Sequence, residues 1–283
     1  MKINKIEVNI TFFILSLAIF LLNFNQFSLY SILIGSILAY LLIMLNEKTN
    51  ITNFKYSKFV IIIISFLIEI IYLNKLTYFI SSNILRNYSG IVISLLLLIS
   101  SLLLIKKGYH TIIKVVLLSS YFFLIIITLG IILGLFYLKI ENYNFTIVPD
   151  NLFNSSILYA FLIFYIYLLT FKLSNAKFNF KAFLISTCYH LFNYLFVIGI
   201  LSNTLTNLYE FSFIVIYKKI NLLNFIERIE FIFSLNYLFC FYYFFVFNFY
   251  YLTSNLKIKN EKNQLIITSL ISISIFIISL LIT

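Results

Sequence analysis

The sequence predicts an all-α polytopic membrane protein with about nine transmembrane helices. Of its 283 residues, 63% are hydrophobic and only 10% are charged, whereas soluble domains carry roughly 25% charged residues. The apolar residues form continuous runs, typically about 20 residues long, which is the length that a helix needs to cross a bilayer. These runs also lack the alternation of a transmembrane β-barrel. We therefore expect a single integral membrane domain over residues 1–283.

Each expected helix is an apolar run between polar connections. Residues 139–154 form a polar segment that we interpret as an outer loop. Residues 210–217 are apolar but too short to span, which favours an interfacial or re-entrant helix. The expected helices cover residues 10–22, 27–45, 59–80, 91–105, 111–137, 155–171, 182–201, 225–252 and 265–282.

Basic residues are concentrated in alternate loops, and this bias predicts the orientation. With the N-terminus in the cytoplasm, thirteen lysines fall in cytoplasmic segments and four basic residues fall in outer ones. The positive charge thus sets topology and does not indicate a nucleic-acid partner. The cytoplasmic lysines are Lys2, Lys5, Lys48, Lys55, Lys58, Lys106, Lys107, Lys172, Lys177, Lys181, Lys257, Lys259 and Lys262, and the outer residues are Arg86, Lys139, Lys218 and Lys219.

A charged stretch stands at the entrance of the eighth predicted helix. Asn224 followed three residues later by Glu227 has the form of a capping box, and acidic residues suit the positive end of a helix. The predicted topology puts Glu227 and Arg228 at the outer face, where they need not be buried. Glu230 lies one turn deeper and is the member that we expect to pair within the bundle.

Glu69, near the middle of the third predicted helix, is a candidate functional residue. A carboxylate at membrane depth is costly and is a functional candidate by default, although pairing with a neighbouring helix is an equal alternative. Lys75 lies six residues later and on a different face. Between the fourth and fifth helices, Gly108 is expected to break the chain, and Lys114 is expected to extend toward the membrane surface.

Two further patterns are explained by helix packing. His190 and Asn193 suggest an intramembrane metalloprotease, but zinc needs three or four ligands and the chain has no HExxH motif. An interhelical hydrogen bond is the preferred role of His190. Gly130 and Gly134 form a small-xxx-small pattern that predicts close helix packing. We expect no enzyme activity, no metal and no cofactor.

Two segments carry a resemblance to a known family. Residues 106–115, KKGYHTIIKV, resemble the basic junction between the fourth and fifth helices of the spore germinant-receptor B subunits. Residues 220–233, INLLNFIERIEFIF, are similar to the segment that opens the eighth helix of that family. The family belongs to the amino acid–polyamine–organocation transporter superfamily. The resemblance implies the ten-helix inverted-repeat transporter fold with the last helix missing.

The resemblance also implies a function. The chain is expected to be a germinant-receptor subunit in a bacterial cell membrane or the inner membrane of a spore, working with an A subunit and a C-subunit lipoprotein. It would sense a small nutrient such as an amino acid and trigger germination. The nutrient is expected near mid-membrane between the first, third, sixth and eighth helices. The residues expected to face it are Asn23, Gln26, Glu69, Tyr159, Tyr165 and Asn236.

Two alternatives remain open within this resemblance. The first is an amino acid transporter of the same fold, which would cycle between inward-facing and outward-facing states. The second is a degenerate, non-binding assembly subunit. The second is favoured by the absence of glycine and proline from residues 10–22 and 155–171, where the family has helix-breaking residues.

Overall fold

The computed structural model describes residues 4–50, 52, 55–143, 149–219, 229–256 and 261–282, and these residues form helices joined by short connections. Seven of the helices are long and apolar enough to cross a membrane, so the chain is a polytopic helical membrane protein. The long helices are α1 (Lys5–Leu22), α2 (Leu29–Thr49), α3 (Lys55–Asn83), α4 (Gly90–Lys106), α5 (Tyr109–Leu135), α6 (Pro149–Tyr167), α7 (Phe180–Leu201), α10 (Ile229–Asn255) and α11 (Glu261–Ile282).

A helix covers most of each of the nine predicted apolar segments, as far as the structure describes them. Helix α4, with 17 residues, is a weaker candidate for crossing a membrane, and in α11 only the stretch Ile266–Leu281 is fully described. The helices of the bundle are therefore established. The prediction that nine of them cross the membrane, and the predicted transporter fold, stay predictions.

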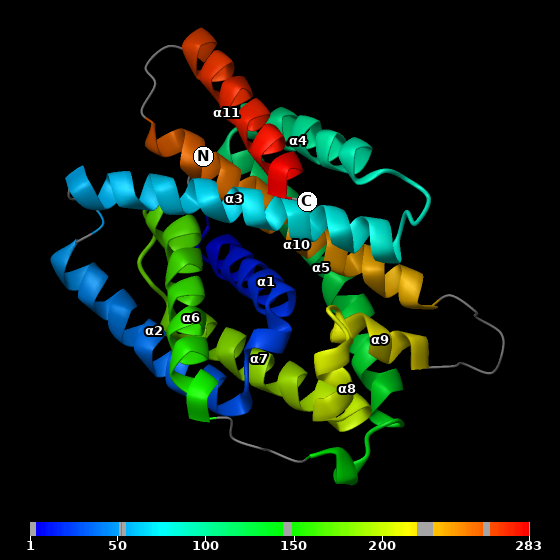
Figure 1. Cartoon of the computed structure of the whole chain (residues 1–283). Helices are drawn as coiled ribbons and strands as arrows, with labels where there is room; N and C mark the ends of the chain where they lie inside the picture. Colours follow the sequence, from blue (N-terminus) through cyan, green and yellow to red (C-terminus); the bar gives the residue numbers. More distant parts are fainter. Residues whose placement is uncertain are drawn as a thin grey trace.

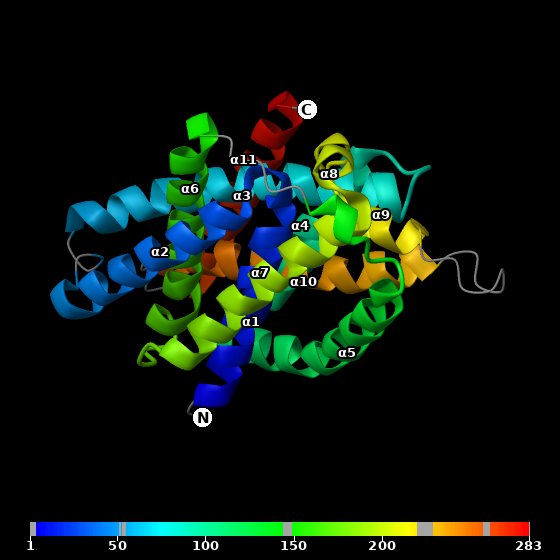
Figure 2. The same ribbon diagram turned by 90° about the horizontal axis from the view of Figure 1, so that it is seen from below.

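Helix α1 lies at the centre of the bundle. Figures 1 and 2 show it surrounded by α3 and α10 on one side and by α6 and α7 on others, and it packs against all but α3 along much of its length. Its side chains from Ile14 to Leu22 are buried without exception. Helix α1 begins five residues before the predicted start, because Asn4 and Glu7 form a capping box there.

Helix α6 differs from the prediction at both ends. It begins at Pro149, so the expected loop over 139–154 is wrong for its last six residues; proline is favoured at the first position of a helix because its missing N–H needs no partner there. At its other end a π-helical turn, η4 (Leu168–Lys172), follows directly. The Leu173 N–H donates to the Leu168 carbonyl at 3.2 Å, which closes this wider turn. The Tyr109 hydroxyl, at the start of α5, donates to the Thr170 carbonyl at 3.0 Å.

The close packing predicted for the two glycines of α5 is confirmed. A Cβ atom on Gly130 would lie 2.8 Å from the Tyr217 ring and would also meet Phe233, and one on Gly134 would collide with the Phe196 ring. Side-chain bulk is therefore excluded from this face of α5, where aromatic rings of α7, α9 and α10 fit against the backbone.

The segment 210–217, predicted as an interfacial or re-entrant helix, forms the short helix α9 (Ser212–Lys219), and another short helix, α8 (Asn203–Leu208), precedes it. Helix α9 is packed into the protein and does not lie on its surface, since Phe213, Ile214 and Tyr217 are buried. Tyr217 stacks on Phe233 of α10 with ring centroids 3.7 Å apart. The predicted capping residues Asn224, Glu227 and Arg228 lie outside the described residues.

Candidate functional site

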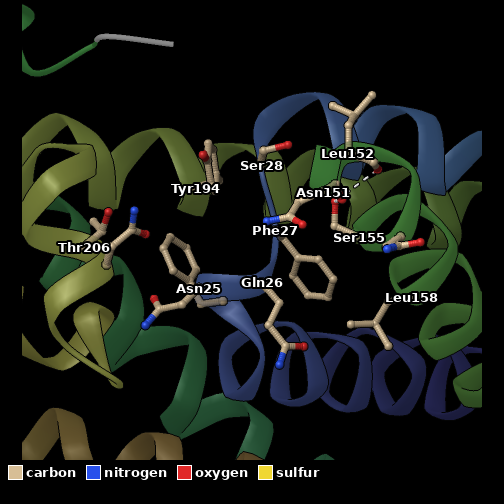
Figure 3. Close-up of a pocket in the computed structure, with 13 residues that line it drawn as sticks. Asn25, Gln26, Phe27, Ser28, Asn151, Leu152, Ser155, Leu158, Tyr194 and Thr206 are labelled. Carbon is tan, nitrogen blue, oxygen red and sulfur yellow. Dashed lines mark hydrogen bonds between the residues drawn. The ribbon is translucent and has the colours of Figure 1, made fainter. Parts of the chain in front are cut away.

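A cleft of about 510 Å³ opens where α1 ends and α6 begins. Figure 3 shows side chains from η1 (Phe24–Gln26), the following Phe27 and Ser28, α6, α7 and α8 around it. Amide and hydroxyl groups dominate the lining, together with three aromatic rings, and none of the lining residues is charged. They are Phe24, Asn25, Gln26, Phe27, Ser28, Asn151, Leu152, Asn154, Ser155, Leu158, Tyr194, Thr206 and Asn207.

Hydrogen bonds fix two of the lining residues, the exposed Asn25 and the half-buried Ser28. The Asn25 amide donates to the Tyr209 carbonyl at 2.7 Å, which ties η1 to the end of α8. Ser28 caps α2 and is bonded to Ser31 in both directions. The side chains of Gln26 and Asn151 are exposed and face the cleft from opposite walls. Only Gln26, among the predicted ligand-binding residues, lines this cleft.

Tyr159 lies just below the cleft, in a buried pair with His190. The Tyr159 hydroxyl is 2.8 Å from His190 Nδ1, so the interhelical hydrogen bond predicted for His190 is confirmed. The imidazole stacks on Phe20 of α1, and the Tyr159 ring meets Phe27 edge to face at 5.3 Å. This cluster supports the floor of the cleft from three helices.

Asn23 closes the end of α1 with help from α3. The Lys75 ammonium donates to the Leu22 carbonyl at 3.0 Å and to Asn23 Oδ1 at 2.8 Å, and the Asn23 amide donates to the Tyr72 hydroxyl at 2.6 Å. A cation at the carbonyl end of a helix is electrostatically favourable. Lys75 therefore serves the buried end of α1, a role that its position in the sequence alone did not indicate.

Glu69 and Tyr165, both predicted as ligand-binding, are brought together by Asn248 of α10. The Asn248 amide donates to Glu69 Oε2, and the Tyr165 hydroxyl donates to Asn248 Oδ1. Sequence reasoning missed Asn248. A lone amide within the aromatic run 244–251, FFVFNFYY, is the feature that could have identified it.

The other predicted residues lie apart from both groups. The Asn236 amide donates to the Phe123 carbonyl at 3.3 Å and so joins α10 to α5. Glu230 is half-buried in the first turn of α10, and Lys114 is exposed on α5. Gly108 separates α4 from α5 with φ at +86°, the left-handed conformation that glycine adopts readily, and this is the chain break expected there.

The six predicted ligand-binding residues thus form no single site. Gln26 lines the cleft, Tyr159 supports it, and Asn23 closes the adjoining helix end. Glu69 and Tyr165 belong to a separate polar cluster inside the bundle, and Asn236 belongs to neither. The cleft lies at helix ends, whereas the prediction placed the ligand near mid-membrane.

Comparison of the chain with protein-family models, with curated proteins and with solved structures found no match.

Proposed function

We propose that this protein is a membrane-embedded sensor of a small nutrient, of the germinant-receptor kind that its sequence resembles. We place the nutrient in the cleft between η1 and α6. The cleft's volume of about 510 Å³ carries the proposal, because it falls within the roughly 300–1,000 Å³ of small-molecule sites.

The lining suits an amino acid in its zwitterionic form. A zwitterion has no net charge, and the lining residues are uncharged. The first turn of α6 contributes Asn151 and Leu152, and the peptide N–H groups at the start of a helix favour a carboxylate. Amide oxygens such as that of Gln26 can accept hydrogen bonds from an ammonium group. Helix ends serve in this way in transporter-type sites.

A nutrient held between Gln26 and Asn151 would bridge the η1 wall and the α6 wall of the cleft. The wall at η1 is tied to α8 through Asn25 and continues into the Lys75-capped end of α1. The opposite wall belongs to α6, which packs most extensively on α2. A ligand that binds more tightly at one separation of the walls increases the population of the conformation with that separation. The partner A and C subunits would respond to this change in population.

Binding of amino acids to the purified protein in lipid nanodiscs tests the proposal. We expect one or a few amino acids to raise the melting temperature with saturable dependence on concentration. The variants Gln26→Ala and Asn151→Ala each remove a hydrogen-bonding group and should weaken binding about tenfold, equivalent to about 1.4 kcal/mol. Asn87→Ala, which removes an exposed amide from the α3–α4 connection, is the matched control and should bind normally.

The same preparation separates the sensor from its alternatives. Concentrative uptake of the bound amino acid into proteoliposomes would identify a transporter of the same fold. An absence of binding across the panel, with normal assembly into a complex with A and C subunits, would identify a non-binding assembly subunit and would refute nutrient sensing by this chain.

A further inference from the structure

Glu69 is a fully buried carboxylate with one oxygen unpartnered among the described residues. It lies at the midpoint of α3 and has 0% solvent exposure. Oε2 accepts a hydrogen bond from the Asn248 amide, whereas Oε1 has no hydrogen-bond partner in the described part of the chain. A buried polar atom without a partner is costly, and a charged one in a membrane is costlier still.

The surrounding cluster has more acceptors than hydrogens. The two amide hydrogens of Asn248 go to Glu69 Oε2 and to the Ser65 carbonyl, the latter at 3.0 Å. The Ser65 hydroxyl donates to the Ile61 carbonyl at 2.8 Å. The Tyr165 hydroxyl has one hydrogen, which is shared between Asn248 Oδ1 and Ser65 Oγ, the latter at 2.8 Å. Every hydrogen of this cluster is therefore committed, and Glu69 Oε1 is left with none.

No described basic side chain compensates Glu69. Lys75 lies six residues further along α3, about 9 Å by helix rise, and its ammonium is bonded to the end of α1. The titratable groups around the cluster are Tyr165 of α6, Tyr251 of α10 and Tyr72 of α3, which are all phenols. Three of the neighbouring helices bring no others, since no titratable side chain occurs in residues 8–22 of α1, 90–105 of α4 or 266–281 of α11.

We propose that Glu69 and its neighbours form a binding site for a monovalent cation, either a proton or an alkali-metal ion. A proton would form an O–H bond at the carboxylate without any redox change. An alkali ion would take oxygen ligands from Glu69, Ser65 and Tyr165, which are the hard ligands that such cations prefer. The single negative charge of the site matches a monovalent ion. Groups of three His, Cys, Asp or Glu side chains, which transition metals favour, are absent from the described residues.

The site is distinct from the proposed nutrient cleft. None of Ser65, Glu69, Tyr165 or Asn248 lines that cleft. Cation binding would hold α3 and α6 together, because these two helices supply its ligands, and Asn248 of α10 is hydrogen-bonded to both of them. It can therefore occur whether or not the cleft binds a nutrient, and the two proposals succeed or fail separately.

Thermal unfolding of the nanodisc-embedded protein, without any amino acid present, tests the site. One arm varies pH at fixed sodium, and the other varies sodium and potassium at fixed pH. Because a ligand stabilises the folded state that binds it, wild type should lose stability either as pH rises or as the alkali ion is removed. Glu69→Gln should abolish that dependence. Glu141→Gln, the same change at an exposed position, should preserve it.

Infrared spectroscopy and the Tyr165→Phe variant distinguish a bound proton from a bound alkali ion. A proton gives a carboxylic-acid band in the wild type that is absent from Glu69→Gln. An alkali ion gives no such band, but its half-saturating concentration should rise about fivefold in Tyr165→Phe, which lacks one oxygen ligand. The proposal would be overturned if the stability of the wild-type protein depended neither on pH nor on the alkali-ion concentration, even if Glu69→Gln failed to fold. A Glu69→Gln protein that kept the full dependence would also overturn it.

Discussion

The side chain of Lys75 stabilises the buried end of α1. Its ammonium donates to the Leu22 carbonyl and to the Asn23 side chain. Lys75→Met keeps the length of the side chain but leaves these two acceptors without a donor. We expect a loss of about 1–3 kcal/mol in the free energy of unfolding, measured by thermal denaturation in detergent. Lys48→Met, at an exposed position in the last turn of α2, should melt like wild type. Equal melting temperatures for both variants would contradict the capping role.

The hydrogen bond of Tyr159 gives a second prediction about the stability of the protein. Its hydroxyl is bonded to His190 Nδ1 inside the bundle, where water does not replace a lost partner. Tyr159→Phe should lower the free energy of unfolding by about 1–3 kcal/mol. Tyr88→Phe removes a hydroxyl from an exposed ring between α3 and α4 and is the matched control. If the two variants have the same stability, the Tyr159–His190 hydrogen bond is not significant for folding.

At the scale of the element, the fit of α5 against its neighbours depends on its glycines. In Gly134→Ala the new methyl group would collide with the ring of Phe196, and such overpacking typically costs about 1–3 kcal/mol. At Gly90 the methyl group would approach only Thr77 Cγ2, at 3.3 Å. Gly90→Ala should therefore retain more stability than Gly134→Ala when both are melted under the same conditions. If Gly90→Ala lost more stability than Gly134→Ala, Phe196 of α7 would not be packed tightly against Gly134 of α5.

The sequence predicts helices better than it predicts their contacts. Apolar runs identified a helix at each of nine places, because backbone groups in a membrane must be satisfied within the segment. Where a helix begins or ends away from its predicted boundary, the cause is a nearby residue, as with Pro149 at the start of α6. The partners of Glu69 could not be predicted, since Asn248 is 179 residues away in the chain and only the packing of α3 on α10 brings them together. The cleft is unpredictable for the same reason, as its walls come from four separate segments of the chain.

At the scale of the whole molecule, the basic loops predict an N-terminus in the cytoplasm. Single cysteines can test this in a protein whose own Cys188 and Cys240 are replaced by serine. Asn87→Cys lies in the connection after α3 and should react with a membrane-impermeant maleimide on intact cells. Lys177→Cys, between η4 and α7, should react only after the membrane is permeabilised. Labelling in the reverse pattern would invert the predicted orientation.

The π-helical turn η4 has a consequence for comparing this chain with other sequences. Its hydrogen bonds join residues five apart, so the turn holds about one residue more than a regular α-helical turn. Each residue advances a helix by about 100°, and the side chains at the end of η4 are rotated by that angle relative to a regular continuation of α6. A relative with an uninterrupted sixth helix must therefore be aligned with a one-residue gap within residues 168–172. Without that gap, the residues at the end of this turn, where the helix stops, would be compared with residues on the wrong face.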